Sequence, residues 1–251
     1  MAAAELRLAS VILGGRSVLL DANLVAAPGE ILGVIGANGA GKTTLLRALL
    51  GLANLSQGVA SLGGRRVEEL SDLERASLVG YLPQERRLAW NMPAWRIAAL
   101  GAANRPPAEA HKRALAALAE VGIEALAERG VRDMSGGERA KTLIARMITT
   151  GAPLLVADEP TAGLDPEASF RVMDILRSRS NAGAAVVVTV HDLTLAGRYC
   201  DRLAVMFAGR ILTTAAPAQA LTRDILGQAF ALEGELIESP AGLVLAARRP
   251  S

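Results

Sequence analysis

The sequence predicts an α/β fold in which a mostly parallel sheet core carries an N-terminal antiparallel β-subdomain and an inserted α-helical subdomain. Three observations lead to this prediction. Short apolar runs of strand length alternate with segments of helical periodicity, which is the pattern of a parallel sheet covered on both faces. Residues 93–150 instead show helical patterns and little strand signal. Residues 6–13 and 18–24 alternate between apolar and polar side chains well enough to suggest two antiparallel strands.

The N-terminal third predicts an antiparallel hairpin followed by a strand, a glycine-rich loop and a helix. Gly14-Gly15 marks the hairpin turn, and Pro28-Gly29 marks the turn that precedes the third strand. Leucines at helical spacing follow the glycine-rich loop. The predicted strands cover residues 6–13, 18–24 and 31–35, and the predicted helix covers residues 42–52.

The remainder of the chain predicts the helical insert, the rest of the core and a tail. Pro106-Pro107 breaks the insert, and the tail at 232–247 resembles a β-hairpin around Ser239-Pro240-Ala241-Gly242. The predicted helices cover residues 109–129, 136–147 and 166–179, and the predicted strands cover residues 154–157 and 185–190. We expect one domain over residues 1–251, with a core of about 1–84 and 151–225, a helical subdomain of about 85–150 and an extension of about 226–251.

Charge and hydropathy exclude several classes of protein. The 27 basic and 25 acidic residues give a net charge of +2, which argues against a nucleic-acid surface built on bulk charge. No apolar stretch approaches the roughly 20 residues that span a bilayer. Glu5 and Arg7 interrupt the segment where a secretory signal would be apolar, and the single cysteine, Cys200, excludes an intrachain disulfide framework. The chain is expected to be soluble, so that any membrane role comes through a partner.

Residues 36–43, Gly-Ala-Asn-Gly-Ala-Gly-Lys-Thr, match G-x-x-x-x-G-K-[ST] between a strand and a helix. Glycines let backbone N–H groups converge on phosphate oxygens, and the helix N-terminus adds positive potential. Lys42 supplies a point charge for the β- and γ-phosphates, and the Thr43 hydroxyl is placed to bind Mg²⁺. The predicted nucleotide-binding residues of this loop are Gly36, Asn38, Gly39, Ala40, Gly41, Lys42, Thr43 and Thr44. The predicted core resembles that of P-loop NTPases of the RecA-like type.

An acidic pair follows the predicted strand at residues 154–157. Asp158 would hold Mg²⁺ through water, and Glu159 would act as the general base that polarises the attacking water. Adjacent strand residues point to opposite faces, but the chain turns at the end of a strand, so both carboxylates can reach one site. The alternative is a solvated acidic pair that caps the next element.

Four further motifs extend this pattern. Residues 134–138 read Met-Ser-Gly-Gly-Glu, Gln84 follows Tyr81-Leu82-Pro83, residues 162–165 read Ala-Gly-Leu-Asp, and His191 stands between Val190 and Asp192. Over about residues 5–225 the chain resembles the ATP-binding subunits of ABC transporters, in which these segments correspond to the signature, the Q-loop, the D-loop and the switch histidine. The resemblance implies ATP and Mg²⁺ as cofactors and ATP hydrolysis as the activity.

Subunits of that family form a head-to-tail dimer that sandwiches two ATP molecules. The resemblance implies that Ser135, Gly136 and Gly137 of one copy complete the site at the partner's phosphate loop, because they would lie on the far side of their own subunit. Ser135 and Glu138 also fit a capping box, and both interpretations can hold together. Glu138 replaces the commoner glutamine of the signature, and we expect its role to be structural.

The resemblance also assigns roles to three other side chains. His191 would contact the γ-phosphate and hold the attacking water, Gln84 would link Mg²⁺ and water to the helical insert, and Asp165 would bridge the two subunits. Without the resemblance, simpler interpretations are a near-core histidine, a surface-loop glutamine and a helix N-cap. His111, the other histidine, lies among basic residues and is expected on a solvated face.

One residue departs from the family pattern. The family often stacks adenine on an aromatic side chain in the first β-turn, and the aligned residue here is Leu13. An aliphatic contact would replace π-stacking. The preference for ATP therefore rests on the resemblance and not on a visible base-reading residue.

A second resemblance concerns what hydrolysis drives. Residues 81–90, residues 99–101 and the Ser-Gly-Gly-Glu variant of the signature resemble the importer branch for iron-siderophores, haem and cobalamin. It implies transmembrane permease subunits, a second copy of this chain (or, since the chain carries one set of motifs, a paralogue) and, indirectly, a periplasmic substrate-binding protein, with no nucleic acid. The location implied is the cytoplasmic face of the inner (plasma) membrane. Trp90, Met92, Pro93 and Trp95 either pack in the core or receive a coupling helix of the membrane subunit.

Two alternatives stay open for the function. An exporter or lipid-transport ATPase would have the same chemistry and a different partner. A soluble ABC protein that acts on the ribosome or on DNA would typically carry two ATPase units, long coiled-coil inserts or basic extensions, and this sequence shows none of these.

Overall fold

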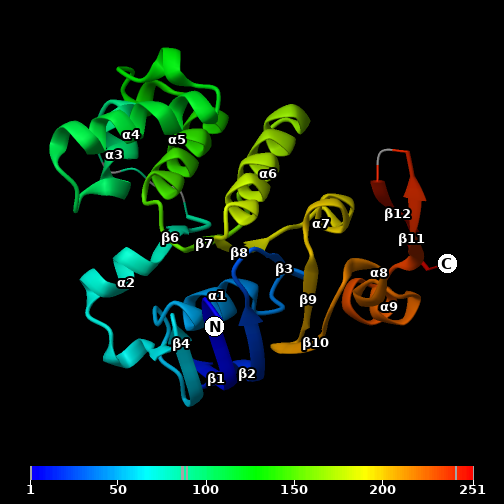
Figure 1. Cartoon of the computed structure of the whole chain (residues 1–251). Helices are drawn as coiled ribbons and strands as arrows, with labels where there is room; N and C mark the ends of the chain where they lie inside the picture. The colour runs from blue at the N-terminus through cyan, green and yellow to red at the C-terminus, as the bar shows by residue number, and fades with distance from the viewer. Residues whose placement is uncertain (1, 86–87, 89, 241, 251) are drawn as a thin grey trace.

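A computed structural model describes residues 2–85, 88, 90–240 and 242–250, and its central feature is a six-stranded sheet (Figure 1). The strands lie in the order β10 (Arg210–Ala215), β9 (Arg202–Phe207), β3 (Ile31–Gly36), β8 (Ala185–Thr189), β7 (Leu154–Ala157) and β6 (Val79–Leu82). All neighbours pair in parallel except β10, which runs antiparallel to β9. Strands β3, β8 and β7 are buried along their whole length because helices or a second sheet cover both faces. The predicted α/β class is confirmed.

A second, antiparallel sheet forms the N-terminal β-subdomain. Its strands are β2 (Arg16–Ala26), β1 (Ala4–Leu13), β4 (Gln57–Leu62) and β5 (Arg65–Arg66), in that order. The predicted hairpin is confirmed, and its strands extend beyond the predicted bounds. Helix α1 (Lys42–Leu49) lies between this sheet and the core sheet, and its buried leucines join side chains of both sheets in one apolar cluster.

Helices cover the other face of the core sheet and share a second apolar cluster with it. The helical subdomain consists of α3 (Ala94–Ala99), α4 (Pro107–Glu120) and α5 (Gly136–Thr149), and it lies beside β6 and β7 (Figure 1). Helices α6 (Pro166–Asn181) and α7 (Leu193–Tyr199) continue the layer. The shorter helices are η1 (Val67–Glu69), α2 (Asp72–Leu78), η2 (Leu100–Ala102), η3 (Glu124–Leu126), η4 (Val131–Asp133), α8 (Pro217–Ala220) and α9 (Arg223–Phe230). Among the described residues, none of the helices is both long and apolar enough to cross a bilayer.

Two helices end earlier than the sequence predicts, and glycine is the reason in both. The predicted helix at 109–129 ends at Glu120, because Gly122 takes φ of 74° and its N–H bonds back to the carbonyl of Ala119. The predicted helix at 42–52 ends at Leu49, and Gly51 takes φ of 68° in the same way. Left-handed glycine after the last turn is the usual end of a helix, so both predictions of length were wrong.

The tail forms the predicted hairpin from β11 (Glu233–Ser239) and β12 (Gly242–Arg248). Ala241 in its predicted turn lies outside the described residues. The hairpin lies beside α7 and α9 at the opposite end of the molecule from the helical subdomain (Figure 1).

Candidate functional site

The predicted site residues follow four neighbouring strands of the core sheet. The order β3-β8-β7-β6 places side by side the strands that lead into the glycine loop, His191, the Asp158-Glu159 pair and Gln84. Because these strands are parallel, all four segments emerge at the carboxyl edge of the sheet, which is where open α/β sheets bind ligands.

The glycine loop follows a backbone path that excludes side chains at two of its positions. Gly36 ends β3 with φ of 154°, and Gly41 precedes α1 with φ of 103°. A Cβ atom at Gly36 would lie 2.4 Å from the carbonyl oxygen of Met206, and one at Gly41 would lie 2.9 Å from that of Val18. The loop therefore presents bare backbone at the N-terminus of α1, as a phosphate-binding loop requires.

Lys42 begins α1 and is buried, with 7% of its surface exposed. Its ammonium donates hydrogen bonds to the carbonyl oxygens of Gly36 at 2.8 Å and Ala37 at 3.2 Å, both in the loop itself. Burial lowers the pKa of Lys42, while the nearby Glu159 and Asp158 carboxylates act in the opposite direction. The loop thus holds a partly desolvated cation, which interacts more strongly with a phosphate than a solvated one does.

Asp158 follows β7 and is fully buried. Its Oδ1 accepts a 2.6 Å hydrogen bond from the Thr189 hydroxyl, whereas its Oδ2 is buried without a hydrogen-bond partner among the described residues. A buried carboxylate oxygen costs free energy unless a donor or cation compensates it. Asp158 therefore fits a divalent cation that keeps some of its waters, as Mg²⁺ does.

Glu159 turns the chain at the end of the strand. Its φ of 54° lies in the left-handed region that residues other than glycine seldom adopt. Its backbone N–H donates to the Thr189 hydroxyl oxygen at 2.7 Å, so one threonine contacts both acids. Strain of this kind gathers at functional sites. The turn explains how two adjacent acids come close to Lys42 although strand residues alternate between faces.

Four side chains from four segments form a continuous chain of contacts. The Gln84 amide donates to Glu159 Oε1 at 3.0 Å, and His191 Nε2 lies 2.5 Å from the same oxygen. The Thr43 hydroxyl lies 3.5 Å from Gln84 Oε1. They border a cleft of about 440 Å³, which is lined by Val18, Asn38, Gly39, Gly41, Lys42, Thr43, Thr44, Gln84, Glu159 and His191. The structure thus brings the predicted catalytic side chains to the glycine loop.

Three predicted residues support this cleft without lining it. Gly36 holds Lys42, and Asp158 is buried behind Glu159. Ala40 is also buried, and its carbonyl accepts the N–H of Gly209 at 3.1 Å. These residues shape the loop and the strand end rather than the open surface.

The signature residues lie outside the cleft. The Ser135 hydroxyl accepts the N–H of Glu138 at 3.2 Å, and the Glu138 carboxylate accepts the N–H of Ser135 at 2.7 Å, so the predicted capping box of α5 is confirmed. Hydrogen bonds from Ser135 lower the pKa of the Glu138 carboxyl. Gly136 has open space around it, and neither it nor Gly137 lines the cleft. Asp165 caps α6 by accepting the N–H of Ala168 at 2.8 Å, as the simpler interpretation predicts.

Val18 also lines the cleft, although it is not among the predicted site residues. The pairing of β1 with β2 shifts between Val11 opposite Leu19 and Ile12 opposite Ser17, so Val18 is the extra residue of a β-bulge. Bulges redirect a side chain next to active sites, but a bulge depends on strand pairing and leaves no local sequence signal. The predicted base contact, Leu13, is 52% exposed at the end of β1 and does not line the cleft.

His111 is exposed, so its predicted place on a solvated face is confirmed. Its ring lies 4.5 Å from the ring of Trp95, a contact that the spacing of the two residues in the sequence does not reveal. Trp95 and Met92 pack against the helical apolar cluster, whereas Trp90 is 73% exposed. Within the predicted importer segment, Arg86, Arg87 and Ala89 lie outside the described residues.

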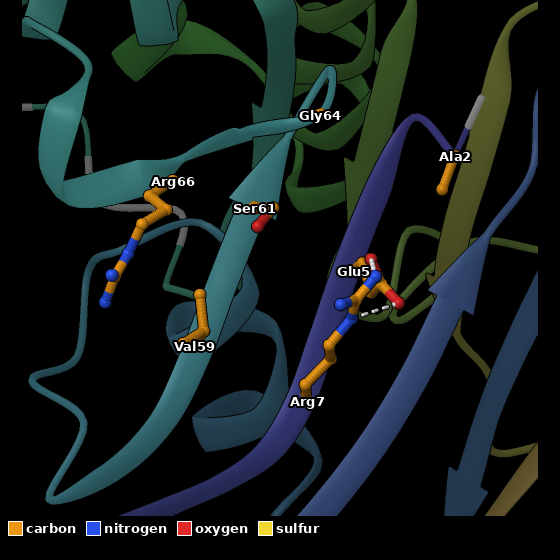
Figure 2. Close-up of a pocket in the computed structure, with 7 residues that line it drawn as sticks. All are labelled: Ala2, Glu5, Arg7, Val59, Ser61, Gly64 and Arg66. Carbon is orange, nitrogen blue, oxygen red and sulfur yellow. Dashed lines mark hydrogen bonds and ion pairs between the residues drawn. The ribbon is translucent and has the colours of Figure 1, made fainter.

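Figure 2 shows a second hollow, on the outer face of the β-subdomain. It measures about 570 Å³ and is lined by Ala2, Glu5, Arg7, Val59, Ser61, Gly64 and Arg66. Arg7 is bound to Glu5 at 2.8 Å, so its charge is already compensated. The hollow contains neither the glycine loop nor the acid pair, and it belongs to no part of the predicted chemistry.

The buried Lys42 in a glycine loop and the acid pair two strands away are features of P-loop NTPases. The chain belongs to the ABC transporter family, whose sequence model matches residues 19–162. The chain is accordingly an ATP-binding protein and an ATP hydrolase of this family.

Individual relatives agree with this assignment. The chain is 37% identical over 246 residues to the hemin import ATP-binding protein HmuV of Rhodococcus jostii, covering 95% of this chain and 84% of the relative. It is 35% identical over 225 residues to the cobalamin import ATP-binding protein BtuD of Halobacterium salinarum, covering 88% of this chain and 56% of the relative. The solved dimeric bacterial ABC transporter cassette MJ0796 superposes with a TM-score of 0.78 at 25% identity, covering 85% and 98%.

Proposed function

We propose that this chain hydrolyses ATP in a head-to-tail dimer to power import through separate membrane subunits, with a haem, iron-siderophore or cobalamin as cargo. The observation that carries the proposal is the division of the site: the cleft holds the hydrolytic residues, while the signature residues lie elsewhere on the same chain. One chain therefore supplies two different halves of a shared site. The dimeric MJ0796 cassette supports this arrangement.

Within one cleft, Glu159 is the general base. Its Oε1 accepts from Gln84 and contacts His191, so the carboxylate is held in one orientation toward the attacking water. His191 assists by holding that water and the γ-phosphate, and Lys42 neutralises phosphate charge. Thr43 and Gln84, with Asp158 through water, would hold Mg²⁺, which would neutralise phosphate charge when bound.

The second half of the site comes from the partner copy. Ser135, Gly136 and Gly137 offer a hydroxyl and bare backbone N–H groups at the start of α5, which suits the phosphates of an ATP held on the other copy. Asp165 contacts the partner while it caps its own helix. The ATPase lies at the cytoplasmic face of the inner membrane through its permease, which a periplasmic substrate-binding protein loads.

The cargo is tested by transport. The names of the relatives, hemin import and cobalamin import, support the importer branch. Reconstitution of the chain with membrane subunits that co-purify with it should give ATP-dependent uptake of haem, a ferric siderophore or cobalamin into vesicles. Efflux, lipid transfer or ATP turnover without any transport would contradict import.

Replacing Ser135 with Arg is expected to weaken ATP-dependent dimerisation at least about thirtyfold, because a bulky cation would replace a contact at the centre of the interface. Binding of ATP to the monomer should be unchanged, since Ser135 lies outside the cleft. Sedimentation of the variant with ATP measures the effect. Ser71→Arg is the matched control, because Ser71 is the N-cap of an equivalent capping box on α2. Dimerisation of Ser135→Arg at the wild-type level would contradict the sandwich.

Replacing Leu13 with Tyr is expected to tighten ATP affinity about fivefold, which corresponds to about 1 kcal/mol for an added aromatic contact. Leu13 is 52% exposed, so the larger ring has space. Leu73→Tyr, at a 72% exposed position on α2, controls for a general effect of a surface tyrosine. Titration of both variants with ATP measures their affinities. An unchanged ATP affinity for Leu13→Tyr would show that adenine does not contact residue 13.

A further inference from the structure

The C-terminal hairpin has one face packed against the body of the molecule and one face turned outward. Leu236 pairs with Leu245, and both pack against the apolar cluster of the helical face. The adjacent pair, Ile237 with Val244, points to the other face because strand side chains alternate. Ile237 is accordingly 44% exposed. The hairpin is therefore attached to the body of the molecule through the face that carries Leu236 and Leu245.

The packed face lies on α7, the helix that follows His191 (Figure 1). The N–H of Leu245 donates to the Thr194 hydroxyl oxygen at 3.2 Å, and Arg198 Nε donates to the Leu243 carbonyl at 3.2 Å. Between them, Gly197 faces Leu243 and is buried. Positions three and four residues apart share one side of a helix, so the hairpin covers one whole side of α7.

The same threonine takes part in the start of α7. Asp192 is the N-cap, and its carboxylate accepts the N–H of Thr194 at 2.8 Å and that of Leu195 at 3.0 Å. Thr194 thus joins the cap to the hairpin. His191 immediately precedes the cap, and its side chain is 47% exposed where it meets Glu159. The His191 side chain therefore leaves the backbone directly before the N-cap of α7.

We propose that the C-terminal hairpin is a positioning element for His191. Packing of Leu236 and Leu245 and the hydrogen bond to Thr194 fix α7, and α7 fixes the His191 ring against Glu159. The inference rests on the proposed function, in which His191 assists hydrolysis. Among its described residues, the hairpin lines no part of the nucleotide cleft and reaches the site only through His191, so we expect it to act on turnover more than on nucleotide affinity.

The test compares two double variants of the full chain. Replacing Leu236 and Leu245 with Ala loosens the packed face, and kcat should fall about five- to tenfold because small displacements of a catalytic group are costly. Replacing Ile237 and Val244 with Ala removes similar volume from the other face and should leave kcat unchanged. Neither pair should change the Kd for ATP. Thr194→Val, which removes only the hydroxyl bond, should lower kcat in the same direction if the first pair fails to fold.

A double-mutant cycle with His191→Ala separates positioning from general damage. In the His191→Ala background, the Leu236 and Leu245 substitutions should cause no further loss, since the group they position is gone. If the packed-face pair lowers kcat in the His191→Ala background by the same factor as in the wild type, the positioning role is overturned. It is also overturned if neither Thr194→Val nor the packed-face pair lowers kcat in the wild-type background. Wild-type turnover of His191→Ala alone would instead contradict the proposed function of the histidine.

Discussion

Replacing Glu159 with Gln is expected to lower ATP turnover about a thousandfold, because general-base catalysis contributes factors of this size. The amide keeps the shape of the side chain, and its carbonyl oxygen can still accept the hydrogen bond from Gln84 that Glu159 Oε1 accepts at 3.0 Å. It cannot take a proton from water. Nucleotide binding should therefore persist, and the ATP-bound dimer should accumulate instead of turning over. Phosphate release under saturating ATP measures the first effect and sedimentation the second.

Glu30→Gln provides a matched control for this substitution. The side chains of Glu30 and Glu159 are 14% and 15% exposed, so both variants remove one charge from a similarly buried position. Glu30 contacts Arg202 and the N–H of Ala27, away from the cleft. Turnover of Glu30→Gln should match that of the wild type. Wild-type turnover in Glu159→Gln would show that another group activates the water.

Replacing Lys42 with Ala is expected to weaken ATP affinity about a hundredfold, because charge-assisted hydrogen bonds to phosphate are worth about 1.5–3 kcal/mol each. The loss is large since Lys42 is buried and its charge is only partly solvated. The variant also removes the donor to the Gly36 and Ala37 carbonyls, so the empty loop should become less ordered. Titration with a fluorescent nucleotide measures the affinity.

Lys112→Ala is the control for Lys42→Ala, because it removes the same side chain from an exposed position on α4. Its nucleotide affinity should equal that of the wild type. Amide exchange over residues 36–44 should increase in Lys42→Ala and not in Lys112→Ala. Unchanged ATP affinity in Lys42→Ala would remove the basis for assigning this loop to phosphate.

Local sequence signals predict the elements around the phosphate loop well. An apolar run, closely spaced glycines and a leucine-rich helix lie within about 20 residues, so the strand, loop and helix needed no distant information. Capping residues are equally local: Ser135 and Asp165 both cap the helices that the sequence assigns to them. The predicted ends of helices were wrong where the predicted helix continued past a glycine that ends it, such as Gly122.

Features that depend on contacts between distant segments could not be predicted. Strand β6 has only four residues, one of which is a glycine, and its parallel pairing with β7 is what makes it a strand. Strands β4, β9 and β10 and helix α2 were also missed, although the capping box of Ser71 and Glu74 was a readable signal for α2. Thr189 looked like one more residue of an apolar strand, and its contacts with both acids arise from sheet order alone.

The shared sheet edge has a consequence for changes in chain length. The four site segments leave adjacent parallel strands whose register is fixed, with Val34 opposite Thr189 and Leu82 opposite Ala157. One inserted residue within such a strand would move everything after it by about 3.3 Å, more than a hydrogen bond tolerates. An insertion in the exposed Gly63-Gly64 turn would leave the site in place. Deletions and insertions should thus be rejected in β3, β6, β7 and β8 while they accumulate in the turns of the β-subdomain.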